Sequence, residues 1–316
     1  ISSLIFLKQH TPPTDNHVLT IGILQTASHP ALDAAREGFE DTVRTALDGK
    51  VEFVVRNAQG SITSAHTIAQ SFHANPTIAG IYAIATPAAQ AIASVEKEKP
   101  IFLAAVTDPH AAGVLQPNGN VCGSTDMVTP DTIVNLVKTL VPQAKTVGLL
   151  YNSGEINSKI QVERLTAALR AQGLQPLEVG VTSEADVPAA TTSVCQKADV
   201  IVLPNDNVMS SSIQLIASLA LKYKKPLIAS DNLLVKHGAL AARGVDYKAS
   251  GAQAGTYAVD VLQHGKKPSE LPLAQPVMGP IMINKKVASE LGIVIPTNTQ
   301  SFTFFFTDSP GESMTT

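Results

Sequence analysis

The stretch 79–109 constrains the fold most strongly, because it combines two strand patterns with one short helix between them. An apolar run covers 81–85, a helical segment covers 88–97, and a second apolar run covers 101–106. Short apolar runs bounded by turn residues are typical of strands that are buried on both faces of a sheet. The stretch therefore predicts a compact strand–helix–strand unit.

Small polar residues directly follow both predicted strands of this unit, at Thr86 and at Thr107 and Asp108. In parallel sheets, ligands bind in the crevice outside the carboxyl ends of the strands. These side chains therefore stand where a ligand would be held.

The same alternation continues along the rest of the chain and is typical of parallel sheets covered by helices. The first set of predicted strands and helices alternates at 18–24, 31–47, 51–55, 61–73, 81–85, 88–97 and 101–106. The second set has predicted helices at 131–140, 159–172, 187–197 and 208–223 and strands at 146–150, 175–181, 200–203 and 226–229. The last predicted elements are a strand at 239–245, a helix at 248–263, a strand at 281–283 and a helix at 285–291.

Two sets of similar size predict an α/β fold with two doubly wound parallel-sheet lobes and a cleft between them. We expect lobe 1 to comprise residues 18–123 and 240–273, and lobe 2 to comprise 124–239 and 274–296. The Gly- and Asn-rich passage 113–124 is predicted to cross between the lobes. Several such crossover strands would permit a hinge motion.

The two ends of the chain do not match this alternation. Residues 1–17 are Pro-, Thr- and Asn-rich towards their end, and we expect a linker that follows a removed export signal. Residues 297–316 are expected to be a C-terminal tail, whose Phe run either stays free or docks on the fold.

Composition argues against several classes of function. The net charge of −3 and the aromatic content of 4%, with no Trp, argue against a nucleic-acid-binding protein. No dinucleotide-binding glycine motif follows a strand and no P-loop occurs, so no cofactor is expected. The eight histidines show no metal-ligand spacing, and we expect no metal. Cys122 and Cys195 are either buried thiols or a disulfide, which depends on geometry.

Several motifs, in order along the chain, resemble those of the substrate-binding proteins of ABC importers. The resemblance is strongest to the subgroup associated with tryptophan and other aromatic amino acids, and it extends over 18–296. The segments that carry it are ILQTASHPALDAAREGFED, ATPAAQAIA, AVTDPHAAGVLQPNGNVCGSTD, LLYNSGEINS, PNDNV and KASGAQAGTYAVDVL.

The resemblance implies the type I periplasmic-binding-protein fold, with two lobes joined by crossover strands and the ligand in the cleft. It also implies a non-enzymatic, monomeric receptor that delivers a small amino acid to a membrane permease, from the periplasm or the cell surface. Members of the family are usually lipoproteins or periplasmic proteins, and the lipidated N-terminal Cys of the family is not seen in this sequence. Where the family pattern leads us to expect GNVTG, residues 119–123 carry Cys122 in place of Thr.

A free amino acid brings a carboxylate, an ammonium and a side chain. The carboxylate needs hydroxyl and backbone N–H groups, which helix N-termini supply. Ser28, Thr86 and Ser158 lie at or near the starts of predicted helices, where each serves either as a ligand donor or as a plain helix cap.

The ammonium needs an acceptor, and a charged acceptor binds it more strongly. Asp108, Asp206 and Asp231 each follow a predicted strand, where a turn-forming Asp is the alternative. Tyr151 would stack on a flat side chain or pack in the hinge. The candidate ligand-binding residues are Gln25, Ser28, Thr86, Pro87, Thr107, Asp108, Tyr151, Asn152, Asn157, Ser158, Asn205, Asp206, Asn207 and Asp231.

Two functions other than transport remain as alternatives. The ligand-sensing module of a transcription regulator shares this fold and predicts an N-terminal helix-turn-helix, for which residues 1–17 are too short and too Pro-rich. A two-cysteine amino-acid racemase needs facing thiols, whereas Cys122 falls in a predicted crossing and Cys195 on a predicted helix. Trp, Phe and Tyr are the first candidate ligands. An amino acid that suits a pocket of Leu, Ile and Ala, a nucleoside or a sugar is the alternative.

Overall fold

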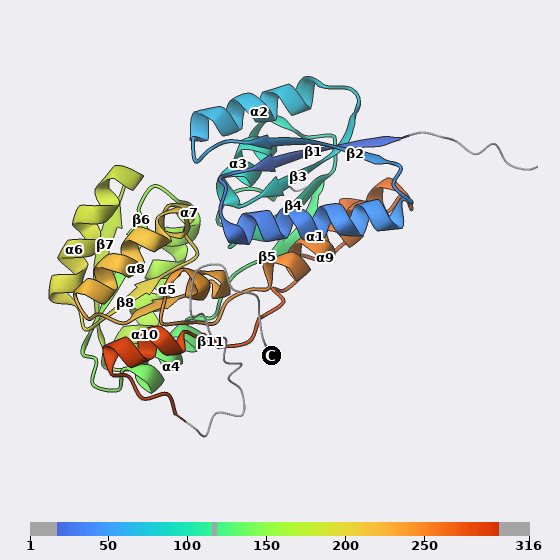
Figure 1. The fold of residues 1–316 in the computed structure, drawn as a ribbon. Helices are drawn as coiled ribbons and strands as arrows, with labels where there is room; N and C mark the ends of the chain where they lie inside the picture. Colours follow the sequence, from blue (N-terminus) through green and yellow to red (C-terminus); the bar gives the residue numbers. More distant parts are fainter. Residues whose placement is uncertain (1–17, 116–118, 297–316) are drawn as a thin grey trace, which may run out of the picture.

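The computed structural model describes residues 18–115 and 119–296, which form two lobes, each built on its own sheet (Figure 1). The predicted N-terminal linker and C-terminal tail lie outside the described residues. The first sheet has the strand order β2-β1-β3-β4-β5 and is parallel throughout. Its strands are β1 (Leu19–Gln25), β2 (Val51–Asn57), β3 (Ile78–Ile84), β4 (Ile101–Val106) and β5 (Val121–Thr125).

Helices cover both faces of the first sheet. In β1, Ile21 and Ile23 pack with Phe39 of the helix on one face, whereas Leu24 packs with Ile92 of the helix on the other face. The split follows from the pleat, because successive side chains of a strand point to opposite faces. The helices of the first lobe are α1 (Pro30–Ala46), α2 (Ile62–Ala74), α3 (Thr86–Val95) and α9 (Tyr247–Leu262).

Helices α1 and α9 lie side by side in Figure 1, and two glycines allow this close approach. A Cβ atom at Gly38 would lie 2.0 Å from the carbonyl oxygen of Lys248, and one at Gly251 would lie 1.9 Å from that of Ala35. Because both contacts are with backbone atoms of the facing helix, any side chain at either position would force the helices apart.

The second sheet has the strand order β11-β10-β9-β8-β6-β7, and only β11 is antiparallel to its neighbour. Its strands are β6 (Thr146–Asn152), β7 (Gln175–Val181), β8 (Val200–Leu203), β9 (Leu227–Ala229), β10 (Ala241–Ala242) and β11 (Met282–Ile283). Its helices are α4 (Pro130–Leu140), α5 (Ile156–Ala171), α6 (Val187–Lys197), α7 (Asn207–Ser211), α8 (Ile213–Lys222) and α10 (Lys285–Leu291). The 3-10 helices are η1 (Glu184–Asp186), η2 (Asn232–His237) and η3 (Pro268–Glu270).

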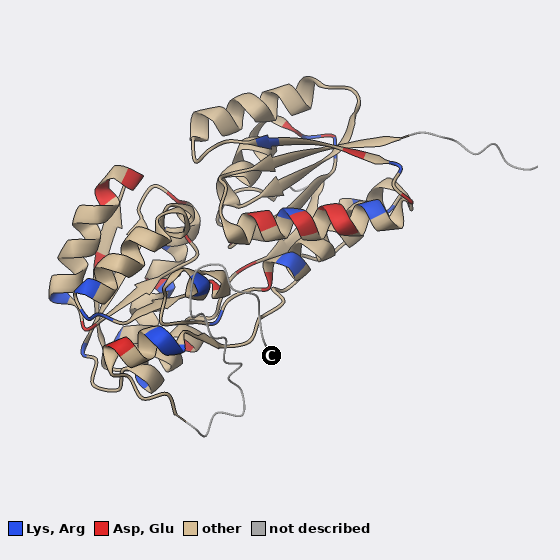
Figure 2. Ribbon diagram, viewed as in Figure 1, with Lys and Arg blue, Asp and Glu red and all other residues tan. Residues whose placement is uncertain are grey.

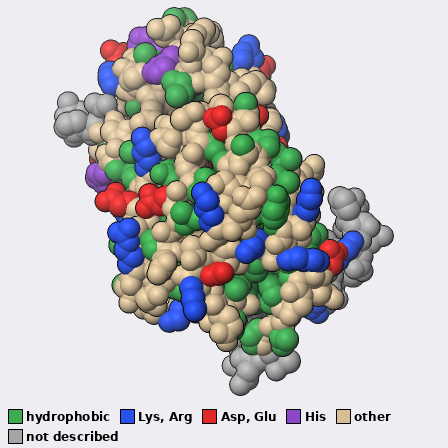
Figure 3. All heavy atoms as spheres, turned by 90° about the vertical axis from the view of Figure 1, so that its left-hand side faces the viewer, with side chains coloured by type: hydrophobic (Ala, Val, Ile, Leu, Met, Phe, Trp, Pro, Cys, Tyr) green, Lys and Arg blue, Asp and Glu red, His purple; other side chains and the backbone are tan. Residues whose placement is uncertain are grey.

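The predicted α/β fold with two doubly wound lobes is confirmed. One hydrophobic cluster runs through both lobes, because residues of the linking segments such as Val128 and Val245 pack into it. Charged side chains of both signs lie along α1, whereas α2 carries no Lys, Arg, Asp or Glu (Figure 2), and the face seen in Figure 3 also carries charged side chains of both signs.

Three segments link the lobes, and their positions correct part of the sequence analysis. The passage 121–125 is strand β5 of the first sheet, so the first crossing follows Thr125 and does not coincide with 113–124. The other segments approach their neighbours through isolated bridges, between Ser124 and Ala274 and between Val245 and Met278. The exact lobe boundaries remain a prediction.

Two predicted elements near these segments are wrong. The predicted strand 239–245 contains only the two-residue β10, which pairs with β9 in the second sheet, although 240–273 was assigned to lobe 1. The predicted helix 208–223 is two helices, α7 and α8, separated at Ser212. Three consecutive serines, 210–212, precede α8, and serine side chains compete with helical hydrogen bonding of the backbone.

Candidate ligand-binding site

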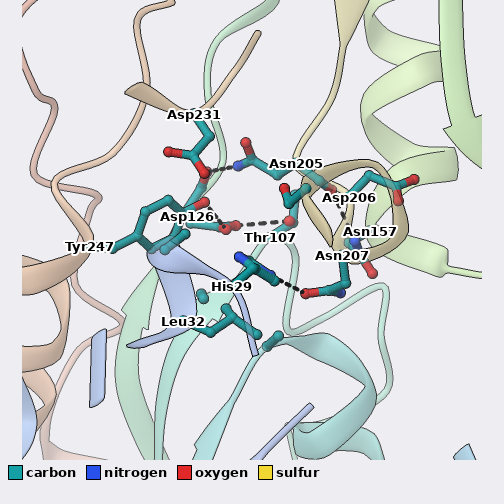
Figure 4. A pocket seen from close by; sticks show the side chains of 14 residues that line it. His29, Leu32, Thr107, Asp126, Asn157, Asn205, Asp206, Asn207, Asp231 and Tyr247 are labelled. Carbon is teal, nitrogen blue, oxygen red and sulfur yellow. Dashed lines mark hydrogen bonds between the residues drawn. The ribbon is translucent and has the colours of Figure 1, made fainter. Parts of the chain in front are cut away.

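A cavity lies between the lobes where the carboxyl ends of strands from both sheets meet, as expected for parallel sheets. The free space inside it is about 20 Å³, which is close to the room that one water-sized group needs. We call it the inner cavity. It is lined by His29, Ala31, Leu32, Ala85, Ala105, Thr107, Asp126, Asn157, Asn205, Asp206, Asn207, Ser210, Asp231 and Tyr247 (Figure 4).

A larger cavity of about 570 Å³ adjoins the inner one and shares Asn207 with it. We call it the outer cavity. Both lobes line it, and its walls include the apolar side chains of Ile62, Pro87 and Ile156. The cleft thus holds a small cavity and a much larger one beside it, each lined by both polar and apolar side chains.

Two asparagines present carbonyl oxygens without a donor at the inner cavity. The Nδ2 atom of Asn157 donates to Glu155 Oε2 and to the carbonyl oxygen of Asn205, both at 3.0 Å. The Nδ2 atom of Asn205 donates to the carbonyl oxygen of Asp126 at 2.9 Å. The Oδ1 atoms of both asparagines are buried, and neither has a hydrogen-bond partner in the described part of the chain. Both amides therefore have unused acceptor capacity where they line the cavity.

Asp231 is a buried carboxyl that has no cationic partner among the residues that the structure describes. It follows β9 and is the N-cap residue of η2. Its Oδ1 accepts a hydrogen bond from the N–H of Leu233 at 2.9 Å. Burial, with a smaller contribution from the negative charge of Asp126, raises the pKa of Asp231 to about 7. The pKa is raised because the ionised form has lost water without gaining a positive neighbour.

Asp126 directly follows β5 and links the end of β4 to the start of α9. Its Oδ1 accepts from Thr107 Oγ1 at 2.8 Å and its Oδ2 accepts from the hydroxyl of Tyr247 at 2.9 Å. Burial raises the pKa of Asp126, and these hydrogen bonds oppose the shift. The carboxyl therefore has a structural role at the crossing and also adds negative potential to the cavity.

Asp206 and Asp108 both bind other groups of the protein through their carboxylates. Asp206 caps α7 by accepting from the N–H of Met209 at 3.0 Å, and its other oxygen accepts from Ser158 Oγ at 2.7 Å. Asp108 caps the next turn and forms an ion pair with Arg164 at 3.0 Å, outside both cavities. The turn-forming alternative therefore describes both residues better than an ammonium contact does.

The structure brings many, but not all, of the predicted site residues to the cleft. Those that line the inner cavity are Thr107, Asn157, Asn205, Asp206, Asn207 and Asp231, and those that line the outer cavity are Pro87, Asn152 and Asn207. Outside both cavities are Gln25, Ser28, Thr86, Asp108, Tyr151 and Ser158.

Several of the outlying residues support the site indirectly. Gln25 donates to Asp33 Oδ1 at 2.7 Å in the first turn of α1, and Ser158 donates to Asp206. Thr86 is buried at the start of α3 and its Oγ1 has no partner. Tyr151 and Ser28 are placed differently, because Tyr151 lines a separate surface pocket and exposed Ser28 accepts from Asn57.

Sequence reasoning missed His29, Asp126, Tyr247 and two alanines. Asp126 directly follows β5, but that strand was interpreted as part of a crossing. Ala85 and Ala105 have φ angles of 75° and 58°, in the left-handed region that residues with a side chain seldom adopt. Such strained positions concentrate at functional sites, and no sequence pattern marks them.

The lobes contact each other directly across the cleft. His29 Nε2 lies 3.2 Å from Asn207 Oδ1, and Gln161 Nε2 lies 3.5 Å from Thr107 Oγ1. The ion pair between Arg164 and Asp108 also joins the two lobes. With these contacts in place, the two lobes are closed over the cleft.

The two free cysteines do not form a facing pair at the cleft. Cys122 is buried in β5 and belongs to the cluster shared by both lobes, whereas Cys195 is buried in α6 and belongs to a different cluster. Neither residue lines the inner or the outer cavity. The placement removes the geometric basis of the racemase alternative.

Two α/β lobes with a polar cavity at the carboxyl ends of their strands define a ligand-binding protein of the type I periplasmic-binding class. The sequence profile of the family described as ABC transporter substrate binding protein matches residues 20–302. The chain therefore belongs to the ABC transporter substrate-binding proteins, as the resemblance predicted.

Known relatives agree with this assignment. The chain is 38% identical over 280 residues to a tyrosine-binding protein of Clostridioides difficile strain R20291, covering 86% of this chain and 80% of that protein. It is 36% identical to the solved structure of a Streptococcus pneumoniae ABC domain in complex with L-Trp, with a TM-score of 0.84 and coverage of 88% and 96%.

Two further structures are informative about conformation and fold. The ligand-free, open structure of a Clostridium difficile substrate-binding protein is 34% identical, with a TM-score of 0.68 and coverage of 92% and 100%. A leucine-binding protein of Thermotoga maritima, at 16% identity, shares the fold with a TM-score of 0.62 and coverage of 87% of each chain.

Substrate-binding proteins of ABC importers work outside the cytoplasm as receptors. Over the part of the chain that the structure describes, no helix is both long and apolar enough to cross a membrane. Over the same residues, no group of three or more His, Cys, Asp or Glu side chains is placed to hold a metal ion.

Proposed function

We propose that this protein binds an aromatic amino acid between its lobes and delivers it to an ABC permease. The observation that carries the proposal is the excess of hydrogen-bond acceptors at the inner cavity, among them Asp231, Asn157 Oδ1 and Asn205 Oδ1. No Lys or Arg is among the residues that line this cavity. An ammonium group supplies three N–H donors and a positive charge, and it therefore complements this site.

The aromatic class is supported by the relatives, one described as tyrosine-binding and one solved with L-Trp. A ring would occupy the outer cavity, against the apolar walls at Ile62, Pro87 and Ile156. The carboxylate would lie near the start of α3, because Ala85 and Pro87 on either side of Thr86 line the two cavities and the positive end of a helix dipole favours an anion.

In this proposal, ligand binding shifts the population towards the closed form. Two observations support it: the direct contacts between the lobes, and the higher TM-score with the L-Trp complex than with the ligand-free, open structure. The closed monomer would dock on its permease in the periplasm, or at the cell surface if it carries a lipid anchor.

A thermal-shift screen of protein that has been unfolded and refolded without ligand tests the proposal. A ligand that binds only the folded state raises the unfolding temperature. Trp, Tyr or Phe should raise it, whereas leucine, nucleosides and sugars should not. A shift produced only by a nucleoside or a sugar would contradict the aromatic amino-acid assignment.

The affinity should fall as the pH drops below 7. Asp231 has a pKa of about 7 without ligand, and a bound ammonium lowers this pKa because it stabilises the ionised carboxyl. Binding below pH 7 then requires loss of a proton from Asp231, and the Kd should rise about tenfold for each pH unit between 7 and 5.

Calorimetry in buffers of different ionisation enthalpy measures this proton release. Burial also raises the pKa of Glu155 to about 7, so Asp231→Asn serves as the control that isolates the contribution of Asp231. We expect a flatter pH profile in that variant. Equal affinities of the wild-type protein at pH 5 and pH 8 would contradict the assignment of Asp231.

A further inference from the structure

His29 has one ring nitrogen occupied and one free at the inner cavity. The side chain lies just before α1, is only 7% exposed, and lines the cavity beside Leu32 (Figure 4). Its Nε2 lies 3.2 Å from Asn207 Oδ1 across the lobe interface. Its Nδ1 is buried and has no hydrogen-bond partner within residues 18–115 and 119–296.

The neighbours of His29 determine which nitrogen carries the proton. Asn207 Nδ2 donates to Glu155 Oε2 at 2.6 Å, which leaves Asn207 Oδ1 facing the imidazole. Because that oxygen only accepts, Nε2 must be the donor. Burial lowers the pKa of His29, so the ring is neutral and its Nδ1 is an acceptor.

The hydrogen bond between His29 and Asn207 crosses from one lobe to the other, whereas the bond between Asn207 and Glu155 lies within the second lobe. His29 belongs to the first lobe, whereas Asn207 and Glu155 belong to the second. Lobe opening separates His29 from Asn207 and releases the constraint on the tautomer. The free space of about 20 Å³ at this point suits a group the size of water, such as an ammonium, and not an aromatic ring.

We propose that His29 is a ligand-binding residue whose Nδ1 accepts a hydrogen bond from the ammonium of the bound amino acid, with Asn207 and Glu155 fixing the required tautomer in the closed protein. The inference rests on the proposed function and adds a contact that only the closed form makes. The titratable groups near the ring are Asp33 on its own helix and Asp126, Glu155, Asp206, Asp231 and Tyr247 from the facing elements. None of these groups is a cation, so the ligand is the donor that the site lacks.

The variant His29→Gln separates this role from a structural one. The Gln side chain can extend its amide N–H to Asn207 in place of Nε2, but it has no atom at the position of Nδ1. We expect the affinities for Trp, Tyr and Phe to fall together by about tenfold or more, with faster dissociation. The unfolding temperature of the ligand-free protein should stay near the wild-type value. His110→Gln, at an exposed position outside both cavities, is the matched control.

The outcomes distinguish this inference from the proposed function. If the wild-type protein binds no aromatic amino acid, the proposed function fails. If it binds them and His29→Gln binds them equally well, the role of His29 is wrong. A loss for Tyr and Trp that spares Phe would overturn the ammonium contact, because the ring group would then be the donor.

Nitrogen-15 NMR of the imidazoles gives a readout that does not depend on a variant. In the ligand complex, His29 should be the neutral tautomer with a proton on Nε2, and the Nδ1 signal should move on ligand addition. A proton on Nδ1 in the complex, whether in the other tautomer or in an imidazolium, would overturn the proposal.

Discussion

Replacement of Asp231 by Asn should weaken binding of L-Trp or L-Tyr by about a hundredfold or more. The carboxyl is buried at the inner cavity, accepts one hydrogen bond from the protein and has no cationic partner there. Removing one member of a buried charge pair typically costs about 3 kcal/mol, which corresponds to that loss of affinity. Titration calorimetry at pH 8, where Asp231 is ionised, measures the effect.

The same substitution should stabilise the ligand-free protein at neutral pH. The pKa of Asp231 is raised from 3.8 to about 7 in the folded state, so the folded protein holds this proton more tightly than the unfolded chain. Protonated Asp231 therefore favours the folded state relative to the ionised form. This contribution to the free energy of unfolding is fully present below about pH 3.8 and is lost as the pH rises to about 7. At pH 8 the buried charge costs up to about 4 kcal/mol, which Asn avoids.

Urea unfolding at pH 4 and pH 8 checks the direction of this pH dependence. Asp231→Asn should be clearly more stable than the wild type at pH 8, and this gain should be absent at pH 4. Asp246→Asn is the matched control, because Asp246 also accepts from a backbone N–H at a helix start but is exposed. A loss of stability at pH 8 in Asp231→Asn would show that the carboxyl has a stabilising partner.

Gly251→Ala should destabilise the protein by about 3 kcal/mol. In most helices this substitution is favourable by about 1 kcal/mol. Here the new Cβ would lie 1.9 Å from the carbonyl oxygen of Ala35, and backbone atoms cannot move aside without shifting α1 or α9. Overpacking of this kind outweighs the gain in helix propensity.

Gly255→Ala on the same helix is the control, because its new Cβ would make less severe contacts. Its Cβ would lie 3.0 Å from Thr42 Cβ and 3.1 Å from the carbonyl oxygen of Phe39, contacts that need a much smaller shift than the 1.9 Å contact at Gly251, so we expect a change within about 1 kcal/mol. Urea unfolding of both variants measures the difference. Equal stabilities would contradict the close packing of α1 on α9. Because α9 begins at Tyr247, which donates to Asp126, Gly251→Ala should also weaken ligand binding.

The sequence predicted the strands and helices well where apolar runs and amphipathic segments alternate. Strand 101–106 and helix 187–197 were placed at their observed bounds. The approach of α1 to α9 could not be predicted, because the glycines at 38 and 251 matter only through the backbone of the facing helix. The two-residue β10 is too short to leave a pattern.

The candidate site was predictable only in part, because some of its residues matter only through contacts with distant parts of the chain. Residues within two positions of a strand end, such as Asn205 and Asp231, were found because strand ends locate the crevice of a parallel sheet. Asp206 also follows a strand, yet it serves as the cap of α7, and sequence does not separate these roles. His29 matters through a contact with residue 207 in the other lobe, which no local pattern indicates.

In our proposal, the cleft recognises an aromatic amino acid through its ammonium. The most direct measurement is calorimetric titration of refolded, ligand-free protein with L-Trp and L-Tyr, and with the same two molecules lacking the amino group. We predict saturable binding of at least one amino acid, and at least about a hundredfold weaker binding of its deaminated counterpart. Equal binding of the two forms, or no binding of either amino acid, would show that the cleft does not recognise an aromatic amino acid through its ammonium.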